Sequence, residues 1–93
     1  MRKYEMMIVF DEEVAAIDQC KTFLYDTLKE HSVKILEEKD LGVKDLAYEI
    51  NKKKKGHYCQ FLLEAEQSVW VEIQKIFKIT KSVMRYIILN QEG

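Results

Sequence analysis

Four consecutive lysines, Lys52 to Lys55, are the side chains of this sequence most able to do chemistry, because they concentrate positive charge on one short segment. Like charges repel, so such a run costs stability unless it is solvated or meets a negatively charged partner. An apolar strand pattern containing Tyr48 precedes the lysines, and Gly56 turns the chain into a second strand that opens with His57 and Tyr58. RNA is a polyanion that suits a basic hairpin tip beside aromatic groups. A solvated turn explains the lysines equally well when they are considered alone.

The sequence offers no recognisable catalytic constellation. Neither histidine lies beside a serine or cysteine nucleophile at a known spacing, and the three glycines do not form a phosphate-binding loop. The two cysteines, Cys20 and Cys59, are too few and too far apart to predict a disulfide framework or a zinc site. Both occupy positions where an apolar residue is expected, so we predict that they are small core side chains. We therefore expect no enzymatic activity, no cofactor and no metal.

Length and charge limit the possible partners. The 93 residues make one domain, which spans residues 1–93. The net charge of −1 hides an asymmetry, since residues 1–40 hold 6 basic and 10 acidic side chains whereas residues 41–93 hold 9 basic and 6 acidic ones. Local fields decide where a polyanion docks, which favours the second part of the chain. No apolar run approaches the roughly 20 residues that cross a bilayer, and there is no signal-peptide pattern, so we expect a cytosolic protein.

Hydrophobic periodicity predicts six elements. Alternating apolar residues predict four strands, over Lys3–Phe10, Val33–Lys52, Gly56–Glu66 and Val83–Asn90. Helical spacing predicts one helix from Asp11 to about His31 and a second, capped by Ser68, through Phe77. A parity shift near Lys44 predicts a bulge in the long second strand. The order strand, helix, strand, strand, helix, strand predicts an α+β, ferredoxin-like fold, in which two helices cover one face of a four-stranded antiparallel sheet.

The other face of such a sheet has no helix to cover it. Strand alternation assigns six apolar side chains to this open face, namely Met7, Val9, Tyr58, Leu62, Ile87 and Leu89. A patch of that kind usually marks a protein-partner site, whereas scattered surface hydrophobic residues are the alternative. We therefore predict that a partner protein binds the open face.

Several short segments form a further pattern. Met1-Arg2-Lys3-Tyr4-Glu5 leads an apolar first strand, Leu41-Gly42-Val43 is followed by Leu46-Ala47-Tyr48 and Ile50, Gly56 opens the third strand, and Ile79 and Val83 bracket the turn into Met84-Arg85-Tyr86. In this pattern the chain resembles bacterial small-subunit ribosomal protein six, from about Arg2 to Leu89. It departs from that family at Glu49, where proline is usual, at Asp45, where a basic residue is common, and at Ser32, where glycine is common.

The resemblance implies a non-catalytic, ferredoxin-like protein of the small ribosomal subunit in the cytoplasm. It also implies pairing with small-subunit ribosomal protein eighteen and joint binding of small-subunit (16S) rRNA. On this hypothesis the candidate phosphate contacts are Arg2, Lys3, Lys44, Lys52, Lys53, Lys54, Lys55, His57, Lys81 and Arg85, and the six open-face residues are candidate contacts to the partner protein. The rival hypothesis is a homodimeric ferredoxin-like module that senses a small metabolite and pairs with itself through the open face.

Overall fold

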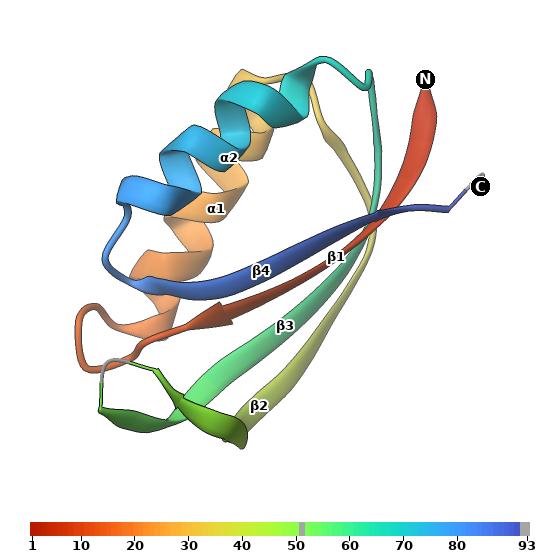
Figure 1. The fold of residues 1–93 in the computed structure, drawn as a ribbon. Coiled ribbons are helices and arrows are strands. Elements are labelled where there is room, and N and C mark those ends of the chain that lie inside the picture. Colours follow the sequence, from red (N-terminus) through yellow and green to blue (C-terminus); the bar gives the residue numbers. More distant parts are fainter. Residues whose placement is uncertain (51, 92–93) are drawn as a thin grey trace.

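The computed structural model describes residues 1–50 and 52–91 and contains the six elements in the predicted order. They are β1 (Arg2–Phe10), α1 (Ile17–Glu30), β2 (Lys34–Ile50), β3 (Lys53–Ala65), α2 (Val69–Ile79) and β4 (Val83–Asn90). The strands form one antiparallel sheet in the order β2-β3-β1-β4. Both helices lie on the same face of this curved sheet (Figure 1). The arrangement is the ferredoxin-like fold that the sequence predicts.

The core lies between the sheet and the two helices. Alternate residues of β1 face it, and Met6, Ile8 and Phe10 are fully buried. They pack with apolar side chains from the facing strand and helices, including Cys20, Leu24, Leu28, Cys59, Phe61, Leu63, Ile73 and Phe77. Burying each large apolar side chain contributes roughly 1.5–3 kcal/mol. Cys20 and Cys59 are both in this core, as predicted.

Trp70, in the first turn of α2, packs at one end of the core. Its side chain is buried, and its ring meets the ring of Tyr4 edge-to-face with centroids 5.2 Å apart. Such aromatic pairs contribute about 0.5–1.5 kcal/mol beyond the area that they bury. The contact fixes the start of α2 against the start of β1.

The first helix begins later than predicted. The acidic segment at residues 11–13 forms a turn, and α1 starts only at Ile17. An Asp11 carboxylate oxygen accepts the backbone N–H of Glu13 at 2.9 Å, and this side-chain contact competes with helical backbone geometry. The backbone N–H of Asp11 also donates to the carbonyl of Ser82 at 2.8 Å, which ties the turn to the start of β4. Val14, assigned by periodicity to the helix, is therefore 51% exposed.

The hairpin between β2 and β3 differs from the prediction in where it turns. The return strand begins at Lys53, so Gly56 lies within β3 and the prediction that it opens that strand was wrong. Lys52 has the left-handed backbone conformation at the turn, with φ of 65°. The predicted second strand, Val33–Lys52, also includes Asn51, which lies outside the described residues.

The register of β2 against β3 shifts at three places. Leu41 is passed over between the pairs Asp40–Cys59 and Gly42–Tyr58, and Gly42 adopts φ of +76° there. The predicted bulge corresponds to a third shift that begins after Asp45, where the next pair is Ile50 with Lys53. Bulges bend the strand that holds the extra residues. The end of β2 consequently curls out of the plane of the sheet (Figure 1).

Within the described part of the chain, no helix is both long enough and apolar enough to span a bilayer.

Candidate nucleic-acid interface

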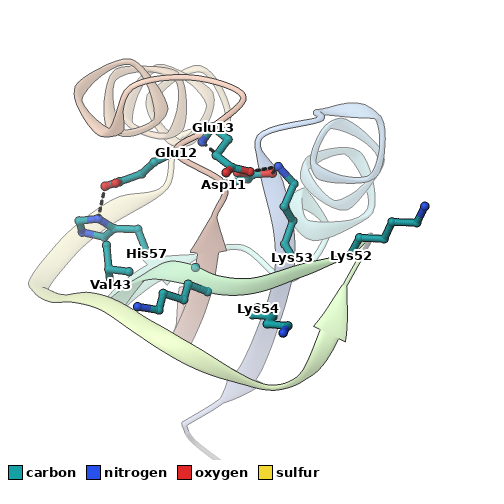
Figure 2. Close-up of a pocket in the computed structure, with 10 residues that line it drawn as sticks. Asp11, Glu12, Glu13, Val43, Lys52, Lys53, Lys54 and His57 are labelled. Atoms are coloured by element: carbon teal, nitrogen blue, oxygen red, sulfur yellow. Dashed lines mark hydrogen bonds and ion pairs between the residues drawn. The ribbon is translucent and has the colours of Figure 1, made fainter.

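The basic residues gather mainly at one end of the molecule, where β1 ends and the β2–β3 hairpin turns. A hollow of about 360 Å³ lies there between the acidic turn and the lysine run. Figure 2 shows Lys53 pointing toward Asp11 and Glu13, whereas Lys52 and Lys54 point away from them. Sequence alone groups the four lysines as one tip, but the structure gives them different surroundings.

Two of these lysines have acidic partners. The Lys53 ammonium is paired with the Glu13 carboxylate and lies 3.7 Å from that of Asp11. Lys54 lies 4.0 Å from Glu49, and both side chains are mostly exposed. Such exposed pairs are worth about 0–1 kcal/mol. Lys54 therefore remains available to another anion at little cost, whereas Lys53 is already neutralised from two sides.

The remaining lysines of the cluster are exposed and have no ion-pair partner among residues 1–50 and 52–91. They are Lys44, Lys52, Lys55 and Lys81. Lys78 joins them, because it lines a second hollow together with Lys53 and Lys81. Sequence reasoning missed Lys78, since a lysine in the last turn of a helix already has an ordinary role against the helix dipole. Its spacing of three residues from Lys81, across the end of α2, was the available signal.

Arg85 reaches the same end from β4. Its guanidinium donates to the Tyr48 hydroxyl at 3.2 Å and lies 5.8 Å from the centre of the Tyr48 ring. Tyr48 belongs to β2, at the opposite edge of the sheet, so the contact records how far the hairpin end curls over the open face. Arg85 and Tyr48 present a cation and an exposed aromatic ring side by side.

Arg2 and Lys3 are exposed but lie at the other end of the sheet. They are the first two residues of the nine-residue strand β1, whose other end lies at the hairpin. A strand rises about 3.3 Å per residue, so the separation is roughly 25 Å. The candidate phosphate contacts therefore fall into a cluster around the hairpin and a separate pair near the N-terminus.

His57 occupies a different environment from the other candidates. Its ring is buried on the helix side of the sheet, with Nδ1 2.5 Å from a Glu12 carboxylate oxygen and Nε2 2.6 Å from a carboxylate oxygen of Asp40. A phosphate would have to displace a carboxylate to reach either nitrogen. The Lys21 ammonium, 2.6 Å away, together with His57 and the Gly42 N–H, holds the pKa of Asp40 well below its usual range.

The open face alternates apolar and polar side chains across the strands. The register gives rows of Leu62, Glu5 and Leu89, then Gln60, Met7 and Ile87, then Tyr58, Val9 and Arg85. Ile87 is 42% exposed and Leu89 53% exposed, while Met7, Tyr58 and Leu62 are half-buried. These residues stay available to a partner.

Val9 differs from the other open-face candidates because the chain itself covers it. It is 3% exposed. A Cβ atom added to Gly56 would lie 2.3 Å from Val9 Cγ1 and within contact distance of Met84 and Leu46. The curled hairpin end and β4 thus seal this corner of the face, and Val9 offers no surface for a partner to contact.

Comparisons with known proteins agree with the fold and identify the family. The family model described as Ribosomal protein S6 matches residues 3–90. The small ribosomal subunit protein bS6 of Mycoplasma mycoides is 41% identical over the whole of this chain and 67% of its own length. The bS6 protein of Treponema denticola is 37% identical over 99% of both chains. A crystal structure of 30S ribosomal protein S6 from Thermotoga maritima has the same fold, with a TM-score of 0.85 and 21% identity over 98% of this chain and 88% of that one. The chain belongs to the ribosomal protein S6 family.

Proposed function

We propose that this protein is a non-catalytic structural component of the small ribosomal subunit, bound to the ribosome in the cytoplasm. It binds small-subunit rRNA through the basic end of the sheet, and small-subunit ribosomal protein eighteen through the open face. Family membership supports the ribosomal role and favours it over the metabolite-sensing alternative. The basic end and the open face adjoin each other, so the rRNA and the partner protein bind side by side.

The RNA-binding part rests on exposed lysines at the hairpin end that have no acidic partner within residues 1–50 and 52–91. They are Lys44, Lys52, Lys55, Lys78 and Lys81. Positive charges on one surface repel each other, and this repulsion costs stability unless solvent screens the charges or a polyanion neutralises them. Lysines contact phosphates as point charges and read no sequence. Specificity then comes from the shape of the RNA and from the partner protein.

The structure narrows the proposed phosphate contacts. His57 and Lys53 already have carboxylate partners, so we assign the main contacts to the lysines without such partners, together with Lys54 and Arg85. Arg2 and Lys3 belong to a second, smaller contact at the other end of the sheet.

Salt dependence of binding tests this assignment. Each phosphate contact adds about 0.7–0.9 to the slope of log affinity against log salt concentration. The double substitution Lys52→Ala and Lys55→Ala should therefore lower that slope by about 1.4–1.8 when the pair with protein eighteen binds small-subunit rRNA. The matched control is Lys29→Ala with Lys75→Ala, which removes the same charge from exposed helix positions that are assigned to neither RNA contact.

Equal slopes for the two double variants would contradict the proposed location of the RNA contact. The metabolite-sensing alternative is tested on the isolated chain by sedimentation. A tight dimer that does not travel with small subunits in a sucrose gradient would contradict the ribosomal proposal.

A further inference from the structure

Three different metal-binding side chains meet beneath the start of α1. Asp40 of β2 is the cross-strand partner of Cys59 of β3, and His57 precedes Cys59 by two residues, so all three side chains lie on the helix side of the sheet. Their potential ligand atoms, one from each residue, lie within 4.8 Å of one another. Asp40 is far in the sequence from His57 and Cys59, and the pairing of β2 with β3 brings the three residues together.

The imidazole of His57 is oriented as in a metal site. Its Nε2 faces Asp40. Its Nδ1 is held by the Glu12 carboxylate at 2.5 Å (Figure 2). Histidines that bind metals almost always give their second nitrogen to a carboxylate, a carbonyl or water, which fixes the ring and raises its basicity. Glu12 is thus a positioning residue for His57.

The thiol of Cys59 supports a metal site independently of the orientation of His57. It is fully buried, and its Sγ has no hydrogen-bond partner within the described residues. The Asp40 side chain is 37% exposed, which leaves a path from solvent to the three ligand atoms.

We infer that Asp40, His57 and Cys59 form a binding site for a divalent transition-metal ion of the Zn²⁺ class. A nitrogen, oxygen and sulfur donor set suits Zn²⁺ and its neighbours and disfavours Mg²⁺ and Ca²⁺, which take oxygen ligands. Binding forms bonds from the metal to Cys59 Sγ and to His57 Nε2, and it releases to solvent both the thiol proton and the Nε2 proton that the Asp40 carboxylate accepts in the metal-free protein. Water supplies the fourth ligand from the exposed side.

Metal binding requires only a small change in the contact between Asp40 and His57. The Asp40 oxygen and His57 Nε2 now share a hydrogen bond of 2.6 Å. Two ligands at the usual zinc distances in a tetrahedron are about 3.3 Å apart, so the metal replaces this bond and separates the two atoms slightly. Lys21 binds the other carboxylate oxygen of Asp40. The first oxygen keeps its hydrogen bond from the Gly42 N–H and offers the metal the position that now faces His57. Because an ammonium repels a cation, Lys21→Met should tighten metal binding.

Co²⁺ is the spectroscopic probe for the untagged protein. We expect one equivalent to give a thiolate-to-cobalt charge-transfer band with the visible bands of tetrahedral Co²⁺, and Zn²⁺ to displace both. Cys59→Ser should abolish the charge-transfer band, whereas Cys20→Ser, which removes the other buried thiol, should retain it. The inference is overturned if the wild-type protein gives no thiolate band, or if Cys59→Ser retains it.

A measurement on the wild-type protein keeps the test independent of how the variants fold. Long-range ¹H–¹⁵N spectra report the state of each ring nitrogen of both histidines. Added Zn²⁺ should shift Nε2 of His57 and leave His31 unchanged, since His31 lies at the other end of α1. Equal shifts at the two histidines, or none at His57, would show adventitious binding and overturn the site.

Discussion

Tyr25 links α1 to β2 through a side-chain hydrogen bond. Its hydroxyl donates to a Glu38 carboxylate oxygen at 2.5 Å. Burial and this hydrogen bond raise the pKa of Tyr25 from 10.0 to about 12, since the bond needs the phenol proton and the carboxylate opposes a phenolate charge. The folded protein therefore holds this proton more tightly than the unfolded chain does.

This shift makes stability depend on pH in the alkaline range. The contribution of Tyr25 to the free energy of unfolding is fully present below pH 10 and is lost as the pH rises toward about 12. Denaturant unfolding of the wild type and of Tyr25→Phe between these pH values should show a shallower decline in the variant. Tyr48→Phe, at an exposed tyrosine, is the control. An identical decline in wild type and Tyr25→Phe would contradict the assignment.

At the residue scale, the sequence predicts burial well and surroundings poorly. Periodicity was sufficient to place Cys20 and Cys59 in the core, because burial follows directly from the face of an element. The same alternation assigned Val9 to an open surface, yet the curled hairpin covers it. The carboxylate partners of His57 come from distant segments, and no local pattern records which side chains the strand register will bring to it.

At the scale of elements, the hairpin end approaches β1 closely at Gly56. Gly56 of β3 is buried beside Val9 of β1. Because Gly56 has no side chain, the side chain of Val9 fits against its backbone. Gly42, the other glycine of the hairpin, has open space around its Cα but a positive φ of +76°. The two glycines are therefore required for different reasons.

Substitution of each glycine should separate these reasons. Gly56→Ala forces a Cβ against Val9 Cγ1, so overpacking should cost about 1–3 kcal/mol. Gly42→Ala should cost about 1–2 kcal/mol through backbone strain alone. Adding Val9→Ala should recover part of the loss at Gly56 and none at Gly42, as measured by denaturant unfolding in a double-mutant cycle. Additive effects of Val9→Ala and Gly56→Ala would show that the clash is relieved elsewhere.

The elements themselves were predictable in type and order, but their ends were not. Long periodic segments recorded all four strands and both helices. The predicted start of α1 was wrong because Asp11 uses its carboxylate in a turn, and acidic residues favour a turn and a helix start alike. The predicted start of β3 was wrong because Gly56 was assigned to a turn, whereas it lies within the strand and packs against Val9.

At the scale of the whole molecule, two layers leave one sheet face without cover. The part of that face near the hairpin is sealed by the curled end of β2, and the part farther from it carries Met7, Leu62, Ile87 and Leu89 in rows with polar neighbours. The pattern resembles an interface of mixed polarity more than a core surface. The sequence predicted which residues line this face, whereas the division into a sealed and an available part required the fold.

The available part should contribute to partner binding and little to folding. Ile87→Gln should weaken binding to small-subunit ribosomal protein eighteen at least about tenfold, which corresponds to 1.4 kcal/mol, because the substitution places an amide in the centre of the proposed contact. Val71→Gln is the matched control, since Val71 is also a large exposed β-branched residue, 61% exposed, but lies on α2 in the other layer.

Both variants should unfold within about 0.5 kcal/mol of the wild type, because neither side chain is part of the core. Isothermal titration of the purified partner then separates binding from stability. Equal binding by the two variants would place the partner elsewhere, and loss of stability in Ile87→Gln alone would mean that the open face supports the fold itself. A selective loss of binding in Ile87→Gln would show that the layer without helices is where the second protein docks.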